Sequence, residues 1–552
     1  MTFLETIFST LEKRPDAPAL QELRDGKLVF ISGKDLLRSV RRARSFLKAM
    51  HLKKGDRCAL LAHNSIRWVA LDLAIMAEGL IVVPLYARQA SEELAIMMKD
   101  CSPSLICCED HAQMVEIKKV WPDAPSICRF DDIFPPRTEA AGTAEHSLQV
   151  ADSDPVTIIY TSGTSGESKG VVLTAGNVGH MLGCTSGRLD VLMNGNSSRD
   201  RVYHYLPLCF CGSWIMLLTC LQRGSLLTMN TDLSKISGEM REVGPDYFLN
   251  VPQLLERMRK AVDEQLWKTG GFVQSIYGHA KVAWFRKQEG KSTAADGLWL
   301  WMAGTFVFPT IRKKMIGGNL KALICGSAPL NIETQLFFMM LGIRVLQVYG
   351  LTETTAICTM DDPRKVDPGW VGPAIQGIEM KLGESEEIIV RGPSIFPGYW
   401  NRPEETAKVL RDGWFHTGDQ GESNAAGNWR IIGRIKNLII LGSGHNIPPE
   451  PIEEEVLQEM PGAQQIVLIG NGRSYLVAIV TGSVTRQAAQ GAIDKVNAGL
   501  PHYKQIRAFY LAAEPFSIEN GLLTANGKLK RDKIAQQYKN EIESLYAMQH
   551  AS

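Results

Sequence analysis

The sequence predicts an α/β protein with a large N-terminal body of mixed sheets and a small, mobile α+β domain at its C-terminus. Through the first half, short apolar runs typical of buried strands alternate with amphipathic helical patterns. Beyond residue 436 the pattern restarts as a compact unit. The length of 552 residues fits two to four domains of roughly 100–200 residues each.

The body contains an early strand–helix–strand pattern. We expect a strand over Cys58 to Asn64 (CALLAHN), a helix over Ser65 to Glu78 and a buried strand over Leu80 to Tyr86 (LIVVPLY). Between Arg364 and Gly398, glycine and proline separate short runs such as EEIIVRG. This change of texture predicts a small β-rich region within the body.

The C-terminal unit has its own pattern. IPPEPIEEEVLQEM predicts a helix, QQIVLIG and YLVAIVTG predict strands, and further helices follow. We therefore expect an N-terminal domain over residues 1–435 and a C-terminal domain over 436–552.

Composition and charge exclude several classes of protein. Apolar residues make up 45% of the chain and charged residues 22%, and the net charge is +1, so the chain has no overall field that would attract nucleic acid. The 11 cysteines form no paired zinc spacing and fit no disulfide framework, which predicts reduced, mostly buried thiols. Glu5 and Glu12 interrupt the pattern that a signal peptide requires, so we expect a cytoplasmic protein.

One apolar segment bears on the expected cytoplasmic location, because it could instead contact a membrane. LWLWMAGTFVFPTI, Leu298 to Ile311, precedes Arg312, Lys313 and Lys314. It is shorter than the roughly 20 residues of a bilayer span and contains Pro309. We expect a buried helix, with the alternative of a surface that contacts the inner face of a membrane peripherally.

The stretch IIYTSGTSGESKGVVL has the composition of a phosphate-binding loop. Walker A spacing fails, because Ser168 occupies the place of its second glycine and Gly170 follows Lys169. Strand-like runs flank the loop, so we expect it to join two strands. Its backbone N–H groups, hydroxyls and lysine could still surround an anion, and a flexible hairpin turn is the alternative. The candidate phosphate residues are Thr161, Ser162, Gly163, Thr164, Ser165, Gly166 and Lys169.

Four further motifs follow in order: CGSAPL, QVYGLTETT, GWFHTGD with GRIKNLIILGSGHNIPPEPIEE, and GLLTANGKLKR. Together with the loop they resemble the adenylate-forming superfamily of acyl-CoA synthetases, luciferases and peptide-synthetase adenylation domains. The resemblance covers nearly all the chain. It implies that ATP and Mg²⁺ convert a carboxylic acid into an acyl-adenylate, with displacement of pyrophosphate.

The resemblance also assigns roles in the nucleotide site. Glu353 would bind Mg²⁺, as would Thr164 of the loop, and Thr352 would contact the phosphate. Asp419 would accept from the ribose hydroxyls, and Arg434 would contact the same sugar and the phosphate. The remaining expected AMP contacts are Gly326, Ser327, Ala328, Gln347, Tyr349 and Gly350.

The resemblance implies that the C-terminal domain takes part in two successive reactions, adenylation of the acid and transfer of the acyl group to coenzyme A. Lys528 matches the family's catalytic lysine, whose charge would bridge the carboxylate and the α-phosphate. Lys436 matches the hinge about which this domain would rotate after adenylation. Rotation would bring Gly442, Ser443 and Gly444 to a tunnel for coenzyme A, whose thiolate would attack the adenylate.

The acyl pocket resembles that of the long-chain fatty acyl-CoA synthetase branch. HYLPLCFCGSWIMLL supplies Phe210, where many relatives carry histidine, and Trp214, which matches a gating tryptophan. Met216, Leu217 and Leu218 are expected to line an alkyl tunnel, although such residues are equally typical of a core.

We therefore expect an AMP-forming ligase for medium- to long-chain fatty acids. Three alternatives stay open: transfer to a carrier protein, another hydrophobic acid, and a catalytically silent nucleotide- or acyl-binding protein. The sequence also leaves open whether the chain forms a homodimer.

Overall fold

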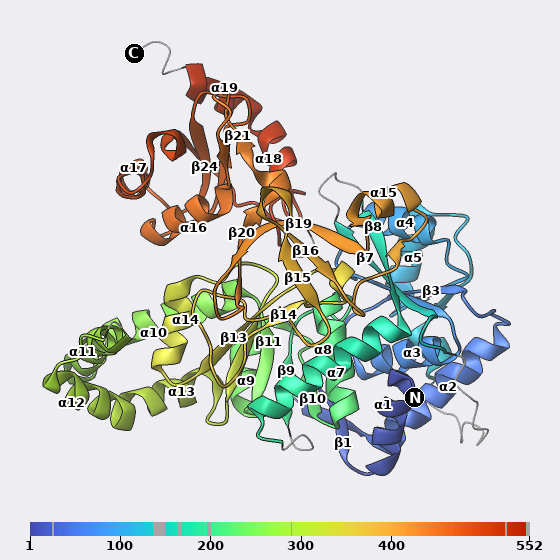
Figure 1. Ribbon diagram of the computed structural model, residues 1–552. Coiled ribbons are helices and arrows are strands. Elements are labelled where there is room, and N and C mark those ends of the chain that lie inside the picture. The colour runs from blue at the N-terminus through green and yellow to red at the C-terminus, as the bar shows by residue number, and fades with distance from the viewer. Residues whose placement is uncertain are drawn as a thin grey trace.

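The computed structural model describes residues 1–24, 27–135, 150–162, 168–195, 200–288, 290–524 and 527–547. Two large sheets form the body, a smaller sheet follows, and a separate unit carries the C-terminus (Figure 1). The predicted mixed α/β fold is confirmed.

The first sheet has seven strands in the order β17-β8-β7-β4-β3-β5-β6. Its central strands are parallel, whereas β7 and β8 form an antiparallel hairpin and β8 also pairs antiparallel with β17. This hairpin is the predicted strand–loop–strand arrangement. The bounds are β3 Arg57–Leu61, β4 Ile81–Leu85, β5 Leu105–Cys108, β6 Ile127–Arg129, β7 Pro155–Ser162, β8 Ser168–Thr174 and β17 Gly398–Tyr399.

The second sheet has eight strands in the order β14-β13-β12-β11-β9-β10-β1-β2. Strands β1 and β9 to β13 pair with one another in parallel. The edge strands β2 and β14 pair antiparallel with β1 and β13, respectively. The bounds are β1 Pro18–Arg24, β2 Lys27–Ser32, β9 Arg201–His204, β10 Leu226–Met229, β11 Tyr247–Asn250, β12 Ala322–Cys325, β13 Arg344–Tyr349 and β14 Thr359–Met360.

The largest apolar core of the body includes side chains from both sheets and from the helices α3, α7 and α8. All α3 side chains from Trp68 to Ala77 are buried, and all of them except Asp72 are apolar, which is typical of a helix enclosed by a core. The helices of the body outside residues 252–316 are α1 Phe3–Lys13, α2 Gly33–Ala49, α3 Ile66–Ala77, α4 Ser91–Cys101, α5 His111–Val120, α6 Phe130–Ile133, α7 Ala175–Leu192, α8 Cys211–Arg223, α9 Ile236–Val243, α14 Ile332–Met340 and α15 Pro403–Val409.

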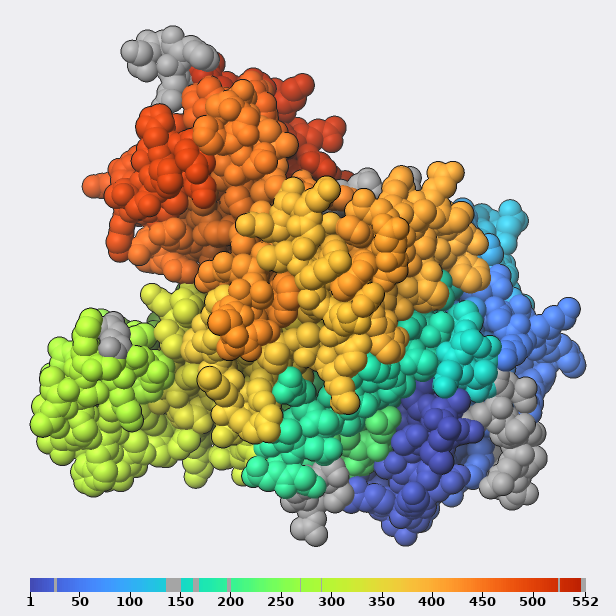
Figure 2. Space-filling model, in the orientation of Figure 1, coloured from blue at the N-terminus to red at the C-terminus, as the bar shows by residue number. Residues whose placement is uncertain are grey.

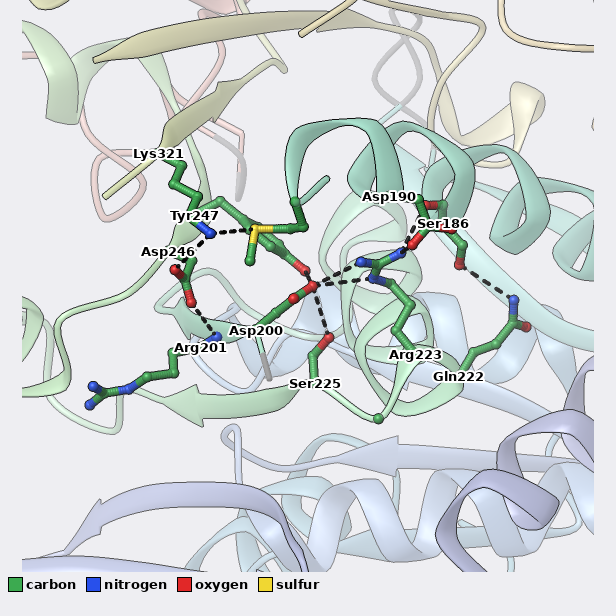
Figure 3. Close-up of polar contacts among 12 residues, drawn as sticks. Ser186, Asp190, Asp200, Arg201, Gln222, Arg223, Ser225, Asp246, Tyr247 and Lys321 are labelled. Carbon is green, nitrogen blue, oxygen red and sulfur yellow. Dashed lines mark hydrogen bonds and ion pairs between the residues drawn. The ribbon is translucent and has the colours of Figure 1, made fainter. Parts of the chain in front are cut away.

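A buried polar network fixes α7 and α8 to the second sheet (Figure 3). Arg223, the last residue of α8, donates to the Asp200 carboxylate at 2.9 Å and to Asp190 of α7 at 2.7 Å. Tyr247 of β11 and Ser225 also donate to Asp200. Since a buried carboxylate needs such partners, the network sets the ends of both helices.

Residues 379–434 form the third sheet, whose order is β15-β16-β19-β18 with β20 paired to β19. It extends the β-rich region predicted near Arg364 to Gly398 towards the C-terminus. The bounds are β15 Glu379–Leu382, β16 Glu387–Arg391, β18 Leu410–Arg411, β19 Trp414–Ser423 and β20 Trp429–Arg434.

The C-terminal unit has apolar cores of its own, made of residues between Ile439 and Tyr546. The predicted helix and two strands are present as α16, β23 and β24, but a third strand, β25, occupies a region where only helices were expected. The bounds are β21 Ile439–Ile440, β22 Asn446–Ile447, α16 Pro449–Glu459, β23 Ala463–Ile469, β24 Leu476–Gly482, α17 Arg486–Asn497, β25 Ile506–Ala512, α18 Arg531–Gln537 and α19 Lys539–Ala547.

The early strand–helix–strand prediction is confirmed by β3, α3 and β4. All 11 cysteines are free thiols and ten of them are buried, as expected. The prediction of a buried helix at Leu298 to Ile311 is wrong in part, because Leu298, Trp301 and Phe306 are exposed while Val307 and Ile311 are buried. Among the described helices, none is long and apolar enough to cross a membrane.

Candidate functional site

A cavity of about 2280 Å³ lies between the C-terminal unit and the body. The carboxyl ends of the parallel strands β12 and β13 open into it, which is where open α/β sheets usually bind ligands. Its lining includes most of the predicted AMP contacts and the catalytic candidate: Gly326, Ser327, Ala328, Gln347, Tyr349, Gly350, Thr352, Asp419, Arg434 and Lys528.

Two glycines let the backbone segments at this edge approach closely. A Cβ on Gly326 would lie 2.6 Å from a methyl of Val348, and one on Gly350 would lie 2.4 Å from the Cα of Ile357. Real side chains do not tolerate such distances. The glycines of CGSAPL and QVYGLTETT are therefore required by packing at the cavity wall, in addition to any contact with a ligand.

Asp419, Arg434 and Tyr349 form one hydrogen-bonded group. Asp419 and Arg434 are paired residues of β19 and β20, and their side chains meet at 3.0 Å. The Tyr349 hydroxyl donates to the other oxygen of Asp419 at 2.8 Å. Asp419 chiefly raises the pKa of Arg434, and burial followed by the charge of Asp419 raises the pKa of Tyr349. The group presents the side chains of a carboxylate and a guanidinium to the cavity.

Glu353 lies in a short 3₁₀ turn, Thr352–Thr354, directly after β13. Its carboxylate is nearly buried and accepts a hydrogen bond of 2.8 Å from the Tyr399 hydroxyl. Tyr399 was not predicted as a site residue. No spacing could indicate it, because the contact joins segments that meet only where β17 pairs with β8.

The strand ends of the phosphate loop are ordered by the hairpin. Thr161 and Lys169 are opposite each other in the register of β7 and β8. Lys169 forms an ion pair with Glu405 and lies 5.3 Å above the Tyr399 ring. Gly163, Thr164, Ser165 and Gly166 lie outside the described residues, as does the side chain of Ser162.

Lys528 lies in a tight turn of the C-terminal unit. Its backbone N–H donates to the Thr524 hydroxyl at 3.0 Å, and its carbonyl accepts from the Thr524 N–H at 2.8 Å. The side chain is solvent-exposed through the cavity. Even so, the surrounding walls lower the pKa of Lys528, Arg434 acts in the same direction, and Asp419 and Glu353 oppose the shift. The structure therefore brings these four charged residues within electrostatic reach of one another.

The predicted hinge residue lies at the cavity, whereas the predicted coenzyme A loop lies outside it. Lys436 lies in the 3₁₀ turn Ile435–Asn437 and lines the cavity. Gly442, Ser443 and Gly444 are exposed between β21 and β22 and are not part of the cavity lining. In this arrangement the C-terminal unit therefore presents Lys528 to the cavity and points its other loop elsewhere.

The part of the cavity where the acyl pocket is predicted is lined by residues of α7 and α8. Phe210 lines it and packs against Tyr86, with ring centroids 5.7 Å apart. Ile215, Met216 and Thr219 also face it, and the Thr219 hydroxyl hydrogen bonds with that of Thr185 at 2.8 Å.

Three predicted tunnel residues belong to the core instead. Trp214 is fully buried, its indole N–H donates to Asp72 at 3.0 Å, and it does not line the cavity. Leu217 and Leu218 are also fully buried and absent from the lining. The reason is helical geometry, since residues next to Met216 project from other faces of α8.

The described residues contain no group of three or more His, Cys, Asp and Glu side chains that could hold a metal ion by themselves. Mg²⁺ is usually held by one or two carboxylates together with substrate phosphates. Glu353, which follows the cavity-lining Thr352 in the chain, fits that kind of site.

Comparisons with known proteins identify the family of the chain. The profile described as AMP-binding enzyme matches residues 7–400, and that of the AMP-binding enzyme C-terminal domain matches residues 436–550. Long-chain-fatty-acid–CoA ligase FadD15 of Mycobacterium bovis is 25% identical, with 98% of this chain and 96% of the relative covered. Long chain acyl-CoA synthetase 3 of Arabidopsis thaliana is 27% identical over 97% of this chain and 90% of its own length.

Solved structures share the fold. O-succinylbenzoate coenzyme A synthetase from Bacillus subtilis, in complex with AMP, has a TM-score of 0.73 at 20% identity and covers 96% of this chain and 97% of its own. A fatty acyl CoA synthetase from Mycobacterium tuberculosis has a TM-score of 0.67 at 22% identity and covers 98% and 99%. With its nucleotide-side motifs gathered at one cavity and a profile match over most of its length, the chain belongs to the AMP-binding enzyme family.

Proposed function

We propose that this protein is an AMP-forming fatty acid–CoA ligase, which joins a fatty acid to AMP and then transfers the acyl group to coenzyme A. The observation that carries the proposal is the convergence of Lys528, Arg434 and Asp419 on one cavity that has an apolar wall from α7 and α8. Curated relatives named as long-chain fatty acid–CoA ligases and acyl-CoA synthetases support this choice.

The roles of the residues follow from charge. Two anions, the carboxylate and ATP, must meet, and negative charge at the α-phosphate must be stabilised during displacement of pyrophosphate. Lys528 is a compact cation on a turn and would bridge the two anions. Asp419, which already accepts a hydrogen bond from Tyr349 and pairs with Arg434, would also accept hydrogen bonds from the ribose hydroxyls. Arg434 would contact the phosphate.

Mg²⁺, when bound, would neutralise charge on the phosphate oxygens, and Glu353 would be its protein ligand. The strand ends carrying Thr161 and Lys169 would hold the phosphates that leave. Tyr399 would orient Glu353, because its hydroxyl donates to that carboxylate.

The position of the C-terminal unit favours the first half-reaction. Lys528 lies in the cavity, whereas Gly442, Ser443 and Gly444 lie outside it. We infer a rotation about Lys436, between domains 1–435 and 436–552, that would exchange these two faces and admit coenzyme A.

The first test is pyrophosphate release and acyl-CoA formation with ATP, Mg²⁺ and fatty acids of graded length. The Lys528→Ala variant should lose about 10²–10³-fold in ATP–pyrophosphate exchange while it still binds ATP. Lys495→Ala is the matched control, because Lys495 is an exposed lysine of the same unit that pairs with Glu459. Exchange at the wild-type rate in Lys528→Ala would refute the catalytic assignment.

A carrier protein remains the alternative acceptor. Parallel assays with coenzyme A and with a phosphopantetheine carrier, starting from the same acyl-adenylate, decide between them. Faster transfer to the carrier would replace the second half of the proposal and leave the first intact.

A further inference from the structure

Residues 252–316 form a helical extension that projects from one end of the body (Figures 1 and 2). It comprises α10 Pro252–Thr269, α11 Gly271–Gln288, α12 Ala294–Met302, the π-helical turn η3 Ala303–Val307 and α13 Phe308–Ile316. Of the 18 large apolar side chains that are exposed among the described residues, seven belong to this extension. They are Trp267, Phe272, Val273, Val282, Leu298, Trp301 and Phe306.

Four aromatic residues gather towards one end of the extension, which we call the apolar tip: Trp267, Phe272, Trp301 and Phe306. Helices α11 and α12 run antiparallel, because Arg286 pairs with Asp296 at 3.4 Å and His279 stacks on Trp299 at 4.3 Å. Continuing this pairing places η3 beside the start of α11, and therefore Phe306 near the level of Phe272.

The other two members lie close to this level. The Trp301 ring lies edge-on to that of Phe306, with centroids 6.2 Å apart. Trp267 precedes Phe272 across the turn at Gly270 and Gly271, both of which have positive φ. A contiguous patch of exposed aromatic side chains is typical of a binding surface, whereas single exposed apolar residues are common on any protein.

The extension is also basic. It contains 11 Lys and Arg residues against five Asp and Glu, while the whole chain has a net charge of only +1. Its exposed lysines include Lys268 beside Trp267, and Lys313 and Lys314 after η3. One of its acids, Asp296, is buried and paired with Arg286. The outer surface of the extension is therefore positively charged.

We propose that the apolar tip docks on the surface of an anionic lipid bilayer. Tryptophan and phenylalanine flanked by lysine are the composition of helices that lie in the headgroup region, with the rings at the acyl boundary and the cations near lipid phosphates. An interface with a second copy or another protein is less consistent with this surface, because lysine is depleted from protein interfaces.

Helix α10 connects the tip to the cavity. Pro252, Gln253 and Glu256 at its start line the cavity, and Trp267 at its end belongs to the tip. At 1.5 Å per residue the two are about 20 Å apart along the helix. If the substrate is a fatty acid, a point that rests on the proposed function, docking holds the cavity near the membrane into which that acid partitions.

The test uses the purified full chain without substrates and vesicles of two compositions, phosphatidylcholine alone and an equal mixture with phosphatidylglycerol. We expect co-sedimentation with the anionic vesicles that weakens at high salt, as electrostatic attraction requires. Phe306→Ser should lower the vesicle partition coefficient several-fold. The control is Phe30→Ser on β2, since the two phenylalanines are 63% and 61% exposed but only Phe306 lies in the extension.

A second measurement does not depend on lost binding. Brominated lipids quench tryptophan fluorescence by contact, so wild-type protein should be quenched, whereas Trp267→Phe/Trp301→Phe should bind the vesicles and lose most of the quenching. Three results would overturn the proposal: no binding of the wild type to anionic vesicles, equal loss in Phe30→Ser, or self-association through the tip without vesicle binding. Adenylation of a soluble short-chain acid without vesicles should be unchanged in these variants, which separates this test from that of the ligase activity.

Discussion

Asp419 at the cavity and Asp200 in the core have nearly the same partners. Each carboxylate binds one arginine and one tyrosine hydroxyl: Arg434 and Tyr349 at the cavity, Arg223 and Tyr247 in the core (Figure 3). They differ in access, because the Arg434 side chain is 36% exposed whereas that of Arg223 is 3% exposed. The same chemical group can therefore contact a ligand where a cavity gives access to the arginine, and serves packing where the arginine is buried.

The core and cavity carboxylates are expected to differ most in the stability that is lost when their arginine is replaced. Arg223→Met leaves the buried Asp200 carboxylate without its cation and should cost about 3–5 kcal/mol of unfolding free energy. Arg434→Met should cost less stability, because the Arg434 side chain is already 36% exposed and Asp419, although buried, lines the cavity. Urea unfolding of both variants measures the contrast, and equal losses would contradict the role of access.

A third buried carboxyl, Asp72, extends the comparison to a site where none of the described cations pairs with the carboxyl. Burial raises its pKa to about 7 although Trp214 donates to it, and its second oxygen has no hydrogen-bond partner. The folded protein thus keeps a proton on Asp72 that the unfolded chain loses near pH 4. The contribution of Asp72 to stability is therefore fully present below that pH and is lost as the pH rises to about 7.

Asp72→Asn imitates the protonated form and should raise the free energy of unfolding by a few kcal/mol above pH 7. Thermal unfolding from pH 5 to pH 8 should show the variant's advantage growing with pH. A constant difference across this range would mean that Asp72 does not titrate as described.

The tyrosines give a smaller contrast. Tyr247→Phe removes a hydrogen bond to a buried carboxylate and should cost about 1.5–3 kcal/mol. In Tyr349→Phe, cavity water can replace the hydroxyl, so we expect a smaller loss of stability together with a higher KM for ATP. Denaturation and ATP–pyrophosphate exchange on both variants separate the two effects, and a raised KM in Tyr247→Phe would refute the division.

The smallest expected effect is on binding at the cavity alone. Asp419→Asn should raise the KM for ATP about tenfold, equivalent to about 1.4 kcal/mol, because an amide accepts less strongly from ribose hydroxyls. Its unfolding free energy should change little, since Arg434 remains partly solvated. An unchanged KM would remove Asp419 from the proposed nucleotide contacts.

The local hydrophobic pattern predicted those helices and strands whose periodicity is visible in the sequence. The run from β3 to β4 was predictable because strand and helix periods differ, and the β7–β8 hairpin because strand-like residues flank the glycine-rich loop. Strand β25 was missed because IRAFYLA follows helical segments closely and only pairing with β24 defines it. Trp214 was assigned to the tunnel because an apolar helix gives no sign of which face meets a cavity.

By itself, the sequence determined the order and identity of the chemical groups: the glycine-rich hairpin, the carboxylates Glu353 and Asp419, Arg434 and Lys528. Only the tertiary structure decided which of them meet. Distant segments are joined where β19 pairs with β20, where β17 pairs with β8, and where the C-terminal unit packs over the cavity. It also decided access, which separates the partly exposed Arg434 from the buried Arg223 and the exposed Phe306 from the buried Val307. The physical reason is that burial and electrostatic reach depend on distances between elements, which no local pattern contains.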